Sequence, residues 1–139
     1  MVIDNKEYVI HIEGNTFHCA LDITMSHIGG KWKTVVLWYL RNQTLRFGAL
    51  KKLIPDITEK MLSLQLKALE EDGLVKREVF VEVPLRVEYS LTDFGKTLIP
   101  ALEEIAKWGR ELAAKKGTME EVAGGQFQKD NSLKVKKRS

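Results

Sequence analysis

The chain has 139 residues, of which 44% are apolar and 29% charged, and its formal net charge is +3. This length and composition predict one globular domain with its own hydrophobic core and exclude wholesale disorder. No run of 18 apolar residues occurs, so we expect no transmembrane helix, and Met1–Glu13 lacks the pattern of a secretory signal. The one cysteine, Cys19, excludes an intramolecular disulfide and favours a reducing, cytoplasmic location.

The positive charge is concentrated near the C-terminal end. Residues 126–139 hold five Lys/Arg and one acidic residue, a local charge of +4, so the rest of the chain carries −1. Net charge therefore does not by itself indicate binding to nucleic acid. We predict that 117–139 is a polar, disordered tail, whose basic residues 134–138 either add non-specific affinity for DNA or are inert.

The first half of the chain reads as a short strand followed by helices. β-Branched and aromatic residues predict a strand over Lys6–Glu13, ended by Gly14-Asn15, within an N-terminal arm over 1–18. Apolar residues that recur at three and four positions predict helices further on. The expected helices are Cys19–Ile28, Lys31–Arg41, Arg46–Ile54 and Glu59–Asp72.

Two β-rich runs and a long helix follow. Leu74–Val83 and Arg86–Leu91 flank Pro84-Leu85 and predict a two-stranded hairpin with one solvated face. Thr92 is expected to cap a final helix, which Pro100 should kink. The apolar ladder of this helix consists of Phe94, Leu98, Leu102, Ile105, Trp108 and Leu112.

The order of these elements predicts an α+β, mostly α fold. A short helix, the link Asp56–Thr58 and the helix Glu59–Asp72 form a helix-turn-helix, and the hairpin 74–91 makes it winged. In this arrangement the second helix of the pair enters the major groove of DNA and the wing lies on the flanking groove or backbone. The winged helix-turn-helix domain, with its dimerisation helices, is expected over 19–116.

The helix Glu59–Asp72 has two different faces. At 100° per residue, Leu62, Leu66 and Leu69 fall within about 60° of one another and predict the buried face. Cations and a hydroxyl suit phosphates and base edges, and an exposed apolar group suits a thymine methyl. A solvated surface would be the simpler interpretation of an isolated helix, but the preceding turn and the following hairpin favour recognition of DNA. The outward candidates for DNA contact are Lys60, Ser63, Leu64 and Lys67.

Further candidates for DNA contact flank this helix. Thr58 is expected to cap it and to leave backbone N–H groups facing a phosphate. Arg46, Lys51 and Lys52 are candidate phosphate ligands, with ordinary surface charge as the alternative. Arg86, near the tip of the wing, either contacts DNA or pairs with a glutamate of the hairpin.

Several motifs resemble the HxlR-type winged helix-turn-helix regulators, which are relatives of the MarR family. They are Ile28–Lys33 (IGGKWK), Arg46–Leu50 (RFGAL), Ile54–Thr58 (IPDIT), Leu69–Arg77 (LEEDGLVKR) and Val87–Gly95 (VEYSLTDFG). The resemblance extends from about Cys19 to Gly109. The sequence departs from the family where Cys19-Ala20 replaces Cys-Pro and where Pro84-Leu85 replaces Pro-Pro, and the first departure bears on the role of Cys19.

The resemblance implies a cytoplasmic transcriptional regulator, either repressor or activator, that binds double-stranded DNA as a homodimer through its first and last helices. The residues point the same way, because the last helix carries more apolar surface than a small domain covers. Packing of this stripe on its own domain is the alternative. A two-fold dimer would bind a pseudo-palindromic operator with its recognition helices about 34 Å apart. We expect no cofactor and no membrane partner, and the sequence does not identify an effector.

Cys19 lies beside His18, just ahead of the first predicted helix. A neighbouring imidazolium or a helix N-terminus favours a reactive thiolate, and the resemblance implies redox or electrophile sensing through a cysteine in this region in some members. A buried structural thiol is the alternative and the commoner role of a free cysteine. His18, Cys19 and His27 are a weak metal-ligand pattern without an evident fourth ligand, so we expect no metal site.

Two other classes of function fit the sequence less well. A winged-helix module that binds protein instead of DNA would suit the exposed Leu64, but Lys60 and Lys67 argue against it. An enzyme is not expected, because the chain has no P-loop, no glycine-rich dinucleotide turn, no His-Glu-x-x-His and no nucleophile elbow.

Overall fold

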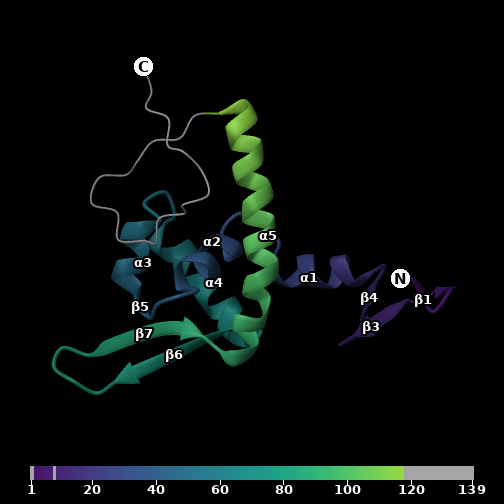
Figure 1. Ribbon diagram of the computed structural model, residues 1–139. Coiled ribbons are helices and arrows are strands. Elements are labelled where there is room, and N and C mark those ends of the chain that lie inside the picture. The colour runs from purple at the N-terminus through teal and green to yellow at the C-terminus, as the bar shows by residue number, and fades with distance from the viewer. Residues whose placement is uncertain (1, 8, 118–139) are drawn as a thin grey trace.

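The computed structural model describes residues 2–7 and 9–117 (Figure 1). The helices are α1 (Ala20–Ile28), α2 (Lys33–Leu40), α3 (Phe47–Leu53), α4 (Glu59–Glu71) and α5 (Asp93–Lys116). The strands are β1 (Val2–Ile3), β2 (Lys6–Glu7), β3 (Ile10–Ile12), β4 (Asn15–Phe17), β5 (Leu45–Arg46), β6 (Val75–Phe80) and β7 (Arg86–Leu91). The predicted helices are therefore confirmed to within two residues at either end, and α5 continues through Pro100.

The N-terminal arm corrects the prediction of a single strand over Lys6–Glu13. It forms two short antiparallel hairpins, β1–β2 and β3–β4. Tight turns with left-handed backbone at Asp4, Asn5, Glu13 and Gly14 separate the paired strands. The β-branched composition correctly indicated extended backbone, but it did not show where the chain reverses.

The wing belongs to a sheet with the strand order β5-β7-β6. β5 was not predicted, because a two-residue strand has no periodicity of its own. It is recognisable only from its pairing with β7, in which Leu45 lies opposite Tyr89 and Arg46 opposite Glu88. This pairing places the segment just before α3 beside the wing.

The leucines of α4 lie at the centre of the hydrophobic core. Leu62, Leu66 and Leu69 are almost completely buried, which confirms the predicted inner face. They belong to one cluster with buried side chains of α2, α3 and the turn that follows α3. Those partners include Val36, Leu37, Leu40, Leu50 and Ile57.

The end of α4 is fixed to the start of α5. The Thr92 hydroxyl donates a hydrogen bond to the Gly73 carbonyl oxygen at 2.5 Å and accepts one from the Gly95 N–H at 2.9 Å. Gly73, at φ 74°, ends α4 in the left-handed conformation that favours glycine. A Cβ atom at Gly95 would collide with the Leu74 carbonyl, so only glycine allows α5 to approach the entry to β6 this closely.

The wing has the one buried face that its alternating sequence predicted, but only near the helices, where Tyr89 and Leu91 of β7 are buried. Val75 is buried at the base of β6, but Val79 is exposed and Phe80 only half-buried. The outer half of the hairpin projects beyond the helices (Figure 1). The alternation of apolar and polar residues therefore corresponds to a buried and a solvated face only where the wing packs against the helices.

α1 and the distal half of α5 carry apolar side chains that the described part of the chain leaves exposed. Leu102 is buried, whereas Ile105 and Trp108 are 60% and 66% exposed. On α1, Leu21 and Met25 are exposed, and Ile28 alone of the predicted stripe is buried. α1 and the N-terminal hairpins lie to one side of α5, and the wing extends on the other (Figure 1). Within 2–7 and 9–117, none of the helices combines the length and the apolar character needed to cross a bilayer.

Two leucines of α4 provide a matched test of this packing. Leu62→Ala is expected to lower the free energy of unfolding by about 2–5 kcal/mol, because it leaves a cavity at a fully buried position. Leu64→Ala, two residues away on the exposed face, is expected to change it by less than about 1 kcal/mol. Urea denaturation of both variants measures the difference, and similar losses in the two would contradict the assigned faces.

Candidate nucleic-acid interface

The turn between α3 and α4 is anchored at both ends. Ile54 and Ile57 are buried within it. The Thr58 side chain accepts a hydrogen bond from the Met61 N–H at 3.0 Å, which caps α4, and Glu59 adds an acidic group to the first turn. These contacts fix the direction in which α4 leaves the turn.

The outer face of α4 is solvent-exposed, as the helical wheel predicted. Lys60, Ser63 and Lys67 are exposed, and Leu64 is 52% exposed. Within the described part of the chain, the side chains of Lys60, Ser63 and Lys67 form neither a hydrogen bond nor an ion pair. Two ammonium groups and a hydroxyl are thus available on one face, with an apolar side chain between them.

The three cations around α3 differ in their surroundings. Arg46, the N-cap residue of α3, and Lys52 are exposed. Lys51 is half-buried, and its ammonium donates a hydrogen bond to the Pro55 carbonyl at 3.1 Å. Lys51 therefore stabilises the turn, because it satisfies a carbonyl just past the end of α3.

Arg86 forms the ion pairs that were the alternative to DNA contact. Its guanidinium lies 3.3 Å from carboxylate oxygens of both Glu82 and Glu88, and 4.0 Å from the centre of the Phe80 ring. The charge of this arginine is therefore balanced within the hairpin, and the residue braces the wing.

The loop at the tip of the wing is apolar instead of cationic. Val81 is 93% exposed, Val83 is fully exposed and Leu85 is 61% exposed. From the sequence we expected this loop to contact DNA only through Arg86, and we did not identify the three apolar side chains. The sequence does indicate an apolar loop, because Glu82 is the one charged residue of 81–85.

The three residues weighed as metal ligands do not form a cluster. Cys19 and His27 lie at opposite ends of α1, about 12 Å apart along the helix axis. His27 Nδ1 is 3.3 Å from Asp72 Oδ2, so this imidazole contacts the end of α4. Cys19 is the half-buried N-cap residue of α1, and the neighbouring His18 donates its backbone N–H to Asp22. Residues 2–7 and 9–117 contain no group of three His, Cys, Asp or Glu side chains placed to hold a metal ion.

Together these elements define the class of the protein. α3, the turn and α4 form a helix-turn-helix, and β6 and β7 form the wing that follows it. The model of the HxlR-like helix-turn-helix family matches residues 27–117, so the chain belongs to that family. It is a winged helix-turn-helix transcriptional regulator, and the family is one of DNA-binding regulators, not a class of enzymes.

Similar proteins have related names and folds. The HTH-type transcriptional regulator YdeP of Bacillus subtilis is 44% identical over 108 residues, which cover 77% of this chain and 84% of YdeP. The redox regulator HypR in its oxidised form is 44% identical, with a TM-score of 0.65 over 67% of this chain and 96% of HypR. The diamide-treated form of YodB from B. subtilis is 31% identical, with a TM-score of 0.57 over 71% of this chain and 95% of YodB.

Proposed function

We propose that the protein acts in the cytoplasm as a homodimer that binds a pseudo-palindromic DNA operator in a sequence-specific manner. The observation that carries this proposal is the outer face of α4, where Lys60, Ser63, Leu64 and Lys67 are exposed while the leucines of the same helix are buried. A helix of this kind fits the major groove of B-form DNA.

Each exposed group of α4 has a matching partner on duplex DNA. Lys60 and Lys67 would contact phosphates or the acceptor atoms of guanine, and Ser63 would bond a base edge. Leu64 would contact the methyl group of thymine. The capped N-terminus of α4 at Thr58 would face a phosphate, with Arg46 and Lys52 as further phosphate ligands and Lys51 supporting the turn.

The wing would contact the flanking groove through its apolar tip. Arg86 is already neutralised by Glu82 and Glu88, so it brings little net charge to the DNA. Val83 and Leu85 are exposed at the end of the hairpin and can lie against the sugar edges that line a minor groove. On this view the cations of α4 supply electrostatic attraction and the wing supplies apolar contact.

The dimer would be formed by α1 and α5. Leu21 and Met25 on α1, and Ile105, Trp108 and Leu112 on α5, are exposed in the single chain. A partner with the same stripe would bury them around a two-fold axis, which places the two copies of α4 on successive turns of DNA.

Lys67→Ala tests the interface on α4. With a duplex selected from a random pool, we expect affinity to fall about tenfold, because each protomer loses one cation. The plot of log affinity against log salt concentration should become shallower by about two units, since a dimer loses two phosphate contacts. Fluorescence anisotropy over a range of salt concentrations measures both effects.

Lys107→Ala is the matched control, because Lys107 is an exposed lysine on α5 and lies away from its apolar stripe. It should leave both the affinity and the salt dependence unchanged. Equal effects of the two substitutions would remove α4 from the interface. If the wild-type protein binds no duplex from the pool, a winged-helix module that binds protein becomes the better interpretation.

Trp108→Glu tests the dimer interface. A charge at the centre of the proposed helix–helix contact should raise the dimer dissociation constant at least about a hundredfold, because the carboxylate would be buried without a partner. Lys107→Glu, on the adjacent but outward position, should leave it unchanged. Sedimentation velocity measures the assembly state, and a Trp108→Glu protein that remains dimeric would contradict the interface.

A second candidate function is redox sensing through Cys19. It is favoured by the similarity to HypR, described as a redox regulator in oxidised and reduced forms, and to the diamide-treated YodB. Cys19 occupies the N-cap position of α1, one of the proposed dimer helices, and is half-buried, so its oxidation would disturb the dimer. Because the chain has one cysteine, a protein disulfide would have to join two chains.

Diamide treatment tests this role. It should release the wild-type protein from its operator, and dithiothreitol should restore binding by reducing the disulfide. Cys19→Ser should bind the operator normally and stay bound in diamide. Release of both proteins, or of neither, in an electrophoretic mobility shift would assign Cys19 a structural role.

A further inference from the structure

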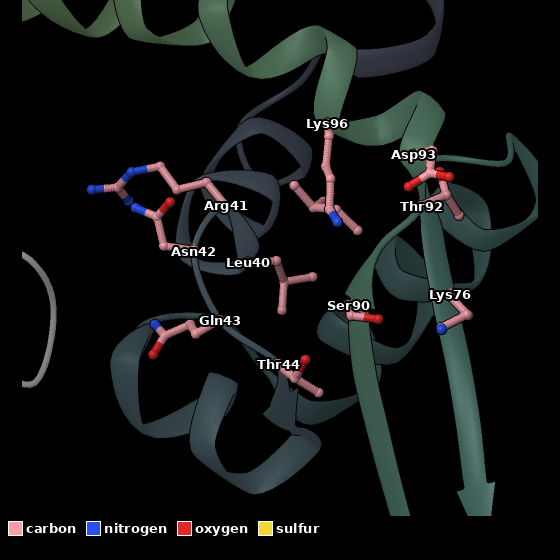
Figure 2. A pocket seen from close by; sticks show the side chains of 11 residues that line it. Leu40, Arg41, Asn42, Gln43, Thr44, Lys76, Ser90, Thr92, Asp93 and Lys96 are labelled. Carbon is pink, nitrogen blue, oxygen red and sulfur yellow. The ribbon is translucent and has the colours of Figure 1, made fainter.

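A polar pocket lies at the junction of the sheet with α5, and none of its lining residues belongs to α4 or to the loop at the tip of the wing. Its volume is about 680 Å³, within the range typical of sites for small molecules. The walls come from the end of α2 and the loop after it, the start of β6, the end of β7 and the first turn of α5. Figure 2 shows the side chains that line it.

Three polar side chains form a row across the floor of the pocket. Lys76 of β6 lies opposite Ser90 of β7 in the antiparallel register, so both side chains project from the same face of the sheet. Thr44 immediately precedes β5, which pairs with β7 on its other edge. In Figure 2, Ser90 lies between Thr44 and Lys76. The row therefore offers two hydroxyl groups and an ammonium.

The side chain of Lys96 in α5 extends toward the same row of polar side chains. Figure 2 shows its side chain directed from the helix toward Ser90. Within the described part of the chain, no hydrogen bond or ion pair occupies the side chains of Lys96, Ser90 or Thr44. Lys76 is 3.4 Å from Glu78, but both side chains are about half-exposed, and such surface pairs are easily exchanged for another anion.

The donors in this pocket outnumber the anionic groups. The lining holds one carboxylate, that of Asp93, and Lys76 pairs with a second, that of Glu78. Arg41 also borders the pocket, but its guanidinium lies 3.9 Å from the Trp38 ring and donates to the Trp38 carbonyl, so it is not counted among the donors. The buried residues Leu40 and Leu91 add apolar surface to the lining.

We propose that this pocket binds the phosphate group of a small phosphorylated metabolite. A phosphate presents several acceptor oxygens in different directions, which matches two ammonium groups and two hydroxyls that converge from the sheet and from α5. The volume exceeds that of a phosphate ion, so it leaves room for an organic part. Gln43 and Asp93 at the rim can bond its hydroxyl groups.

The pocket is distinct from the outer face of α4 and from the tip of the wing, although Thr44 lies two residues before the candidate phosphate ligand Arg46. Lys76 and Ser90 pair at one end of the hairpin, whereas Phe80 and Arg86 pair at the other, next to the wing loop. A ligand held by Ser90 and Lys96 would join the sheet that carries the wing to α5. Its binding does not require the protein to be bound to an operator, so the ligand site and the DNA-binding proposal can be tested independently.

Glucose 6-phosphate and inorganic phosphate are suitable probes, with glucose and sodium chloride at matched ionic strength as controls. We expect glucose 6-phosphate to raise the melting temperature saturably and to give a calorimetric isotherm at roughly millimolar affinity or better, with phosphate binding more weakly. Glucose and sodium chloride should neither raise the melting temperature saturably nor give a binding isotherm. Phosphate binding as tightly as the sugar phosphate would equally support recognition of the phosphate group.

Two substitutions localise the binding. Lys96→Ala and Ser90→Ala should each weaken binding of glucose 6-phosphate, the first by about tenfold, because each removes one donor from the pocket. Lys107→Ala, on the same helix outside the pocket, should bind as the wild type does, and circular dichroism checks that the variants are folded. The proposal is overturned if neither probe binds saturably, or if Lys96→Ala and Lys107→Ala bind alike.

Discussion

The burial of three leucines on one face of α4 is the constraint on which the rest of the molecule depends. Rotating α4 by one residue would turn its outer face by about 100° and bring Leu62 and its neighbours toward solvent. Exposing three leucines costs about 5–9 kcal/mol, which is comparable to the whole stability of a small domain. The orientation of Lys60 and Lys67 is therefore set by side chains that they do not touch.

The same principle explains how much of the candidate interface could be predicted from sequence. The faces of α4 follow from the spacing of Leu62, Leu66 and Leu69, because a helix converts spacing into direction without help from distant residues. Thr58 was predicted to cap α4 for an equally local reason, since the cap hydroxyl needs only the N–H three residues ahead. Both features were correct in the structure.

The features that escaped prediction depend on contacts between distant segments or on a choice among competing partners. β5 forms because it pairs with β7, which is distant in the sequence. The outer half of the wing is solvated because the helices do not extend over it. Arg86 had carboxylates and DNA as competing partners, and the sequence could not rank them. Lys51 was in principle recognisable, because a lysine four residues before a free carbonyl at a helix end is a local pattern.

The close approach of Gly95 to Leu74 has a mechanical consequence for the whole molecule. α5 has 24 residues and is therefore about 36 Å long; it packs on the hydrophobic core from Gly95 to Leu102, whereas Ile105 and Trp108 beyond are exposed. The part of α5 beyond Leu102 is about 21 Å long, so tilting it by about 10° would move its far end by about 4 Å. Small changes in how α5 packs beside Gly95 would therefore displace Ile105, Trp108 and Leu112 further than they displace its first turn.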